Sequence, residues 1–174
     1  MKRCSLLLLA VIIIVSSSSC GLRQTKLPEN TDGGQAQSSQ NDIETIYFSR
    51  NAVLLKDAYK TAYKVDLKNQ AYYRMDGSLS AVKDWGTDSG DRGFKFVSEL
   101  SADKVDAFLL ESARLGLAQW KDSYEKLALD GASWDIVILF SDGQRKEVHG
   151  ENDYPETWDE LHQALLTLTG MNKW

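Results

Sequence analysis

Cysteine, proline and histidine are all scarce in this chain. Its 174 residues include two cysteines (Cys4 and Cys20), two prolines and two histidines. Because no cysteine follows Cys20, residues 21–174 can form neither a disulfide nor a thiolate site. We therefore expect this part of the chain to be stabilised by its hydrophobic core alone.

A hydrophobic run long enough to cross a membrane is also missing. The longest unbroken apolar run, residues 6–15, has ten residues, whereas a transmembrane helix needs about 20. Lys2 and Arg3 precede this run, and a serine tract that ends at Cys20 follows it. A basic start, a short apolar core and small residues before a cleavage site are typical of a bacterial secretory signal peptide.

Cys20 distinguishes a lipoprotein signal from an ordinary one. Small residues precede Cys20 and Gly21 follows it, although Ser17 stands where leucine is usual. We predict that residues 1–19 are a lipoprotein signal peptide and that Cys20 carries the lipid. This lipid would anchor the protein outside the cytoplasm, to the cell membrane or the outer membrane. The alternative is an ordinary cut in the serine tract, which would release a soluble protein.

Positive charge is in short supply as well. Without Lys2 and Arg3, the chain carries 18 basic and 25 acidic residues, a net charge of −7. A nucleic-acid-binding protein needs a basic surface to neutralise phosphate, and attraction to anionic lipid also needs basic residues. We therefore expect no nucleic-acid partner, and we expect the lipid rather than surface charge to hold the protein at the membrane.

The composition changes near residue 43. Residues 20–42 are rich in Gln, Asn, Ser, Gly and Thr, and such a segment cannot bury enough apolar surface to offset the entropy of ordering it. We predict a flexible linker there, spanning on the order of 25 Å. The rest of the chain, residues 43–174, has the size of a single domain.

Hydrophobic periodicity predicts several strands and two hairpins. Alternating apolar and polar residues indicate a strand at residues 63–67, and a nearly continuous apolar run indicates a central strand at residues 134–140. The turns at residues 68–70 and at Asp142-Gly143 indicate hairpins. Residues 51–60 are compatible with a loop or a helical turn, and residues 76–93 are expected to form a loop. The predicted strands are residues 43–48, 63–67, 71–75, 94–97, 134–140 and 144–149.

Two helices are also predicted. Ser101 is a suitable cap for the first helix, Asp103 complements its dipole, and Gly116 is a natural end. Pro155 is suited to start the second helix, and Gly170 to end it. Apolar residues recur at helical spacing in both segments: Val105, Phe108, Leu109 and Leu115, then Trp158, Leu161, Leu165 and Leu168. We predict an α+β fold, in which an antiparallel sheet has two helices packed on one face.

Several short motifs occur within residues 100–170. They are Leu100-Ser101-Ala102-Asp103, Trp120 with Tyr124, Asp130-Gly131 before Trp134, Ser141-Asp142-Gly143, and Gly150-Glu151-Asn152-Asp153-Tyr154-Pro155. In these motifs the chain resembles an uncharacterised domain, of unknown function, that is found in bacterial lipoproteins. The resemblance covers less than half of the chain. It implies the fold and an envelope location, and it implies no catalytic residues.

The segment before the second helix is the best candidate binding site. Its backbone N–H groups could hold an anion or a carboxylate at the helix start. The alternative is a capping loop, in which Asn152 or Asp153 accepts hydrogen bonds from the helix N-terminus while Tyr154 and Trp158 pack. The candidate binding loop comprises His149, Asn152, Asp153, Tyr154 and Trp158.

Metal-binding patterns are weak. His149 and His162 would need to converge, with a carboxylate such as Asp159 as a third ligand, and the chain has no H-E-x-x-H motif. We therefore expect no metal and no cofactor.

A second acidic segment could bind calcium through oxygen ligands. Asp84, Asp88 and Asp91 lie near Trp85 in a glycine-rich stretch, but their spacing is not that of an EF-hand. We favour a solvated loop.

Aromatic residues raise the possibility of a glycan-binding surface. We expect Trp120, Trp134 and Trp158 to pack in the core, because they lie next to periodic apolar positions. Exposed tyrosines could instead bind a sugar or form a protein interface. The tyrosines in question are Tyr59, Tyr63, Tyr72 and Tyr73.

No catalytic signature is present. The chain has no nucleophile elbow, no phosphate-binding loop and no dinucleotide fingerprint. We predict a non-catalytic, membrane-anchored module that binds another envelope protein, such as a hydrolase that it restrains. One alternative is a glycan or small-ligand binder that uses exposed aromatic side chains. Another is an envelope hydrolase with an unrecognised pair of carboxylates.

Overall fold

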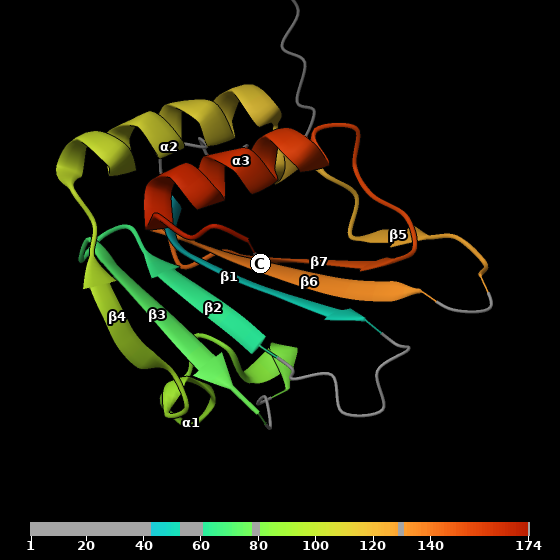
Figure 1. Cartoon of the computed structure of the whole chain (residues 1–174), viewed down its shortest axis with the longest axis horizontal. Helices are drawn as coiled ribbons and strands as arrows, with labels where there is room; N and C mark the ends of the chain where they lie inside the picture. The colour runs from blue at the N-terminus through green and yellow to red at the C-terminus, as the bar shows by residue number, and fades with distance from the viewer. Residues whose placement is uncertain (1–42, 53–60, 78–80, 129–130, 174) are drawn as a thin grey trace, which may run out of the picture. The chain divides into compact units, whose positions relative to one another are not determined.

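A computed structural model describes residues 43–52, 61–77, 81–128 and 131–173 (Figure 1). The predicted signal peptide, the linker with Cys20, and Tyr59 lie outside the described residues. Within the described ranges, no helix combines the length and the apolar character that crossing a bilayer requires.

Seven strands form one sheet in the order β4-β3-β2-β1-β6-β7-β5. All neighbouring strands are antiparallel except β5 and β7, which are parallel. The predicted hairpins join β2 to β3 and β6 to β7. The strands are β1 (Ile43–Ala52), β2 (Thr61–Asp66), β3 (Ala71–Asp76), β4 (Lys95–Glu99), β5 (Ser123–Glu125), β6 (Ala132–Phe140) and β7 (Arg145–Glu151).

The turn between β6 and β7 shows why the hairpin signal was strong. Gly143 has a φ of +82°, in the left-handed region that glycine adopts without a steric cost. The Asp142 carboxylate accepts a hydrogen bond from the Gln144 backbone N–H at 2.9 Å, and the Gly143 N–H donates to the Phe140 carbonyl at 3.0 Å. The hairpin predicted at Asp142-Gly143 is therefore confirmed.

Three α-helices accompany the sheet in the described residues: α1 (Asp88–Asp91), α2 (Ala102–Leu115) and α3 (Trp158–Thr169). Two short 3-10 turns, η2 (Val82–Asp84) and η3 (Leu117–Gln119), precede α1 and follow α2. The predicted α+β class is confirmed in this form, a seven-stranded and mostly antiparallel sheet with three helices. The parallel strand β5 and the helix α1 were not predicted.

Both long helices end as predicted, and α2 also begins at the predicted position, whereas α3 begins later than predicted. Gly116 and Gly170 hold the left-handed conformation that ends α2 and α3. Ser101 is the residue before α2, but its side chain makes no capping hydrogen bond. Pro155 does not start α3, because its carbonyl accepts the Trp158 N–H in a turn and Thr157 is the residue before the helix.

Strand alternation places consecutive residues in two separate cores. On β1, Ile46 and Phe48 belong to the main core, which also contains Phe108 of α2 and Leu161 of α3. Tyr47 between them belongs to a smaller core. In Figure 1, α2 and α3 lie next to each other above the strands, and α1 lies below them.

The smaller core is closed by the segment that carries η2 and α1. It consists of Tyr47, Ala62, Val137 and Trp85, and the last of these comes from this segment and is 0% exposed. The Tyr47 and Trp85 rings stack with centroids 5.8 Å apart. The Arg145 guanidinium donates to the Trp85 carbonyl at 2.5 Å, which ties the segment to β7. The prediction that residues 76–93 form a loop is therefore wrong for this part of the segment.

Candidate functional site

Aromatic rings fill the space around the loop that precedes α3. The Tyr154 ring stacks on Trp134 with centroids 6.0 Å apart and planes at 13°. Trp158 lies closer still, with its ring centroid 4.3 Å from that of Trp134. Trp134 is fully buried and Trp158 is 7% exposed. The structure therefore places Tyr154 and Trp158 in packing contacts, and a substitution of Trp158 would test folding before it tested binding.

Asn152 closes the end of the β6–β7 pair. Its side-chain oxygen accepts the Ala132 N–H at 2.9 Å, and its own N–H donates to the Ala132 carbonyl at 3.0 Å. Its φ of +57° is a left-handed conformation that asparagine tolerates better than most residues. The interpretation that Asn152 or Asp153 caps α3 is wrong, because Thr157 occupies the N-cap position and no side chain caps there. Asp153 contributes its carbonyl, which accepts the Trp134 Nε1–H at 2.9 Å.

His149 does not join the rest of the predicted loop. It lies on β7 between Val148 and Gly150, which face Trp134 and the main core. Alternation along a strand turns the His149 side chain to the opposite face of the sheet. There its Nδ1 lies 2.8 Å from an Asp135 carboxylate oxygen.

A row of three polar residues crosses the sheet at this point. Ser49 of β1 pairs with Asp135 of β6, which in turn pairs with His149 of β7. The Ser49 hydroxyl donates to the second Asp135 carboxylate oxygen at 3.2 Å. Because the serine contacts the carboxylate and not the imidazole, the row lacks the serine–histidine contact of a catalytic triad.

The second histidine lies elsewhere. His162 is on α3, and partial burial lowers its pKa, with the Arg50 guanidinium acting in the same direction. His162 lies on α3, whose Leu161 and Leu165 belong to the main core, whereas the His149 side chain points to the opposite face of the sheet. The two histidines therefore do not converge on one ion with Asp159. Among the residues that the structure describes, no three His, Cys, Asp or Glu side chains are grouped in a way that could hold a metal.

Asp91 anchors the segment with Asp84 and Asp88, which the sequence suggested as a possible calcium site, to the rest of the fold. Its Oδ2 accepts hydrogen bonds from the Tyr47 hydroxyl at 2.9 Å and from Lys64 Nζ at 2.7 Å. Its Oδ1 accepts the Gly86 N–H at 3.0 Å. Burial, followed by the nearby Asp91 carboxylate, raises the pKa of Tyr47 and keeps this hydroxyl protonated as a donor. With both oxygens already bound, Asp91 supports the fold rather than a cation site with Asp84 and Asp88.

The tyrosines considered for glycan stacking are mostly buried. Tyr63 is 9% exposed and Tyr72 is 3% exposed, and their rings stack with centroids 6.1 Å apart. Burial raises the pKa of both hydroxyls. Tyr73 is half-buried, and its ring meets Phe96 edge-on. The alternative in which Tyr63 and Tyr72 form an exposed platform is therefore contradicted by their burial.

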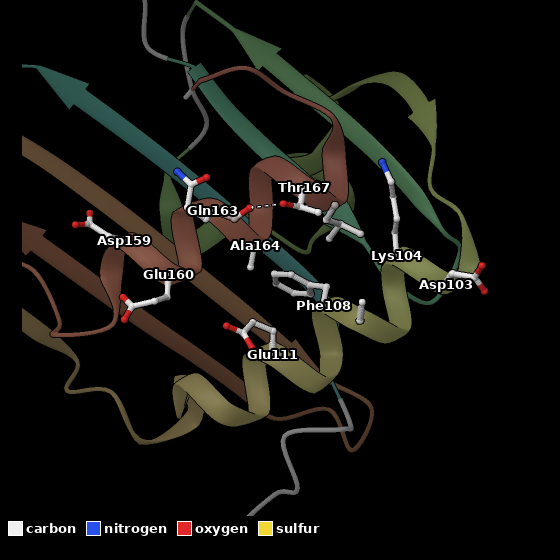
Figure 2. A pocket seen from close by; sticks show the side chains of 11 residues that line it. Asp103, Lys104, Phe108, Glu111, Asp159, Glu160, Gln163, Ala164 and Thr167 are labelled. Carbon is white, nitrogen blue, oxygen red and sulfur yellow. Dashed lines mark hydrogen bonds between the residues drawn. The ribbon is translucent and has the colours of Figure 1, made fainter.

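A groove between α2 and α3 has a volume of about 590 Å³. Its floor is apolar and includes Phe108, Leu168 and the small side chains of Ala107 and Ala164. In Figure 2, Ala164 points toward Phe108 across the space between the two helices. The small alanine side chains leave this space open, where larger residues would close it.

Carboxylates dominate the rim of the groove. Asp103, Glu111, Asp159 and Glu160 line it, against the single cation Lys104. Because α2 and α3 run in opposite directions, Glu111 lies at the same end as the first turn of α3 (Figure 2).

We call the group formed by Glu111, Asp159 and Glu160 the acidic end of the groove. Arg114 donates two hydrogen bonds to Glu111, at 2.6 and 2.9 Å, and they lower the pKa of that carboxyl. Arg114 also interacts electrostatically with Glu160. Asp159 and Glu160 are exposed, so both carboxylates are accessible to a charged ligand.

Sequence reasoning did not identify this groove. Ala107 and Ala164 are 57 residues apart in the sequence, and only the packing of α2 against α3 brings them together. The available sequence signal was the exposed, acidic residues that lie on the same side of each amphipathic helix as Ala107 and Ala164. That signal indicates a solvated helix face unless the partner helix is known.

Comparisons of the chain with models of protein families, with curated proteins and with solved structures found no match. The resemblance to a lipoprotein domain therefore stays a prediction.

Proposed function

We propose that this chain is a lipid-anchored envelope protein that binds another envelope protein and does not itself catalyse a reaction. Cys20 carries the anchor, residues 20–42 serve as the tether, and the domain presents the binding site. In this proposal α2 and α3 form a two-helix layer on one face of the sheet, and the groove between them receives the partner.

The observation that carries the proposal is the groove itself. Its volume of about 590 Å³ lies within the range of about 300–1,000 Å³ that is usual for ligand sites. An apolar floor bordered by charged residues is also the usual anatomy of a protein interface. Leu110, on the same helix as Phe108, is 75% exposed.

The packed aromatic residues Trp134, Tyr154 and Trp158 help to hold α3 in place beside α2. The Thr157 hydroxyl donates to the Leu115 carbonyl at 3.2 Å, and so joins the start of α3 to the end of α2. The packing of Trp158 on Trp134 holds the same end of α3 against the sheet. In this role the predicted loop positions α3, and the partner contacts the outer surface of the helices.

Site-specific photo-cross-linking in intact cells tests the proposal. A photoreactive amino acid is placed at Ala107, which is exposed and lines the groove, and in a control protein at the fully exposed Leu127. We expect one dominant protein adduct from position 107 that position 127 does not give. If both positions capture the same set of proteins, or if position 107 captures none in correctly anchored protein, the groove is not the binding site.

A further inference from the structure

We propose that the occupant of the groove is an amphipathic helical segment of the partner protein, with lysine or arginine residues placed at the acidic end. This inference rests on the proposed function and adds the chemistry of the partner. The shape of the groove, the apolar character of its floor and the uneven distribution of its charges each supply one part of the argument.

The shape of the groove fits a helix. It follows α2 from Asp103 to Glu111, a distance of about 12 Å at 1.5 Å per residue. A groove between two antiparallel helices is a natural seat for a third helix, because side chains spaced at i, i+3, i+4 and i+7 enter it in a row. A segment of about two turns matches this length.

The apolar floor of the groove favours a bound segment that has one apolar face. Phe108 and Leu168 are 3% and 2% exposed, so the floor is formed by well-packed side chains. Ala107 and Ala164 also line the groove, and their small side chains leave room for leucine-sized groups from the partner. Burial of a leucine side chain from the partner would remove apolar surface from water on both sides.

The acidic residues on the rim favour lysine or arginine on the polar face of the bound segment. The acidic end has three carboxylates and one nearby cation, Arg114, which forms an ion pair with Glu111 and also interacts electrostatically with Glu160. At the opposite end Asp103 is accompanied by the cation Lys104, so that end is close to neutral. A segment with its lysine or arginine residues toward the acidic end would gain electrostatic attraction there, whereas an acidic segment would be repelled.

Synthetic peptides test this inference. The probes are fluorescein-labelled amphipathic peptides of about four helical turns with leucines at helical spacing. One version carries lysine at the polar positions and the other carries glutamate. We expect the lysine peptide to bind at least about tenfold more tightly, to weaken as salt is raised, and to gain helical circular dichroism on binding.

Substitutions locate the bound peptide. We expect Asp159→Asn with Glu160→Gln to weaken binding of the lysine peptide by about fivefold to tenfold, which is the loss of two favourable charge interactions. Asp106→Asn is the matched control, because Asp106 is an exposed carboxylate on α2 that does not line the groove. Ala107→Arg should abolish binding by filling the groove, while Leu127→Arg, which adds the same charge elsewhere, should not.

Two outcomes would overturn the inference: equal binding of lysine and glutamate peptides, or a lysine peptide that binds Ala107→Arg as tightly as the unchanged protein. If position 107 captures a protein in cells but no lysine peptide binds, the basic helical occupant is wrong and the groove remains the binding site. If position 107 captures nothing, the proposed function fails as well, so the two failures are distinguishable.

Discussion

Trp134 is the residue on which the aromatic contacts beneath α3 converge. Its ring lies within 6.0 Å of the rings of Tyr124, Tyr154 and Trp158, measured between centroids. Its indole N–H donates to the Asp153 carbonyl. Gly150 on β7 leaves room for this ring, because a Cβ at that position would lie 2.0 Å from Trp134 Cε2. At this position glycine is required by close packing and not by backbone conformation.

We predict that Gly150→Ala destabilises the protein by about 1–3 kcal/mol, the usual cost of adding a methyl group to a closely packed core. The new methyl would meet a fully buried indole, so the sheet or the ring must shift. Urea unfolding followed by tryptophan fluorescence measures the loss.

A double-mutant cycle provides the control for this prediction. Phenylalanine lacks Nε1 and Cζ2, two of the three Trp134 atoms nearest to the added Cβ. Trp134→Phe combined with Gly150→Ala should therefore cost less than the sum of the two single changes. Strictly additive costs would show that the indole is not what excludes a side chain at Gly150.

At the scale of secondary-structure elements, the segment containing η2 and α1 is held to the sheet by a few polar contacts. Asp91 binds Tyr47 and Lys64, and Arg145 donates to the carbonyls of Trp85 and Val82. Lys64 Nζ also lies 5.6 Å from the Tyr47 ring centroid, within the range of a cation–π interaction. These contacts explain why a stretch with the composition of a loop adopts an ordered structure.

We predict that Asp91→Ala costs about 2–3 kcal/mol, because it leaves the buried Tyr47 hydroxyl and the partly buried Lys64 ammonium without their shared acceptor. The cost should appear in chemical denaturation, together with faster amide hydrogen exchange in residues 82–91.

Asp88→Ala is the matched control, since Asp88 is an exposed carboxylate on the same short helix. Its removal should change stability by no more than about 0.5 kcal/mol. Equal costs for the two substitutions would mean that the acceptor role of Asp91 is not what holds α1 to the sheet.

At the scale of the whole molecule, the sequence divides into a predicted signal, a predicted tether and a described domain. The chain has no cysteine after Cys20, so a single thiol would determine whether the mature protein is attached to a membrane. The domain would then reach its partner only within the span of the tether.

We predict that Cys20→Ala moves the protein from the membrane fraction to the soluble fraction, because several acyl chains are needed for stable attachment and Cys20 would carry them. Cell fractionation with immunoblotting, alongside metabolic labelling with a palmitate analogue, measures both effects. Cys4→Ala is the control, since Cys4 lies within the predicted signal peptide and its loss should change neither result. A Cys20→Ala protein that stays in the membrane fraction would contradict the anchor.

Local features of the sequence predicted much of the fold. Strands β2, β3 and β7 follow from alternation and turn residues, β6 follows from a nearly continuous apolar run, and the ends of α2 and α3 follow from Gly116 and Gly170. Each of these signals depends on neighbouring residues alone: a period of two or 3.6, or a positive φ at one glycine. The position of His149 could also have been inferred, since alternation separates it from Val148.

The remaining features depend on contacts between distant segments. Strand β5 has three residues and is defined by its parallel pairing with β7, and α1 is held by residues of β1 and β2. The groove exists only because α2 and α3 pack together, and its acidic end combines Glu111 with Glu160.

By itself the sequence determined the order of the principal strands and helices, the C-terminal ends of the two long helices and the charge of the molecule. The tertiary structure alone decided which residues share a surface. The physical reason is that periodicity specifies which face of an element is apolar, whereas the partner of that face is chosen by packing over the whole chain.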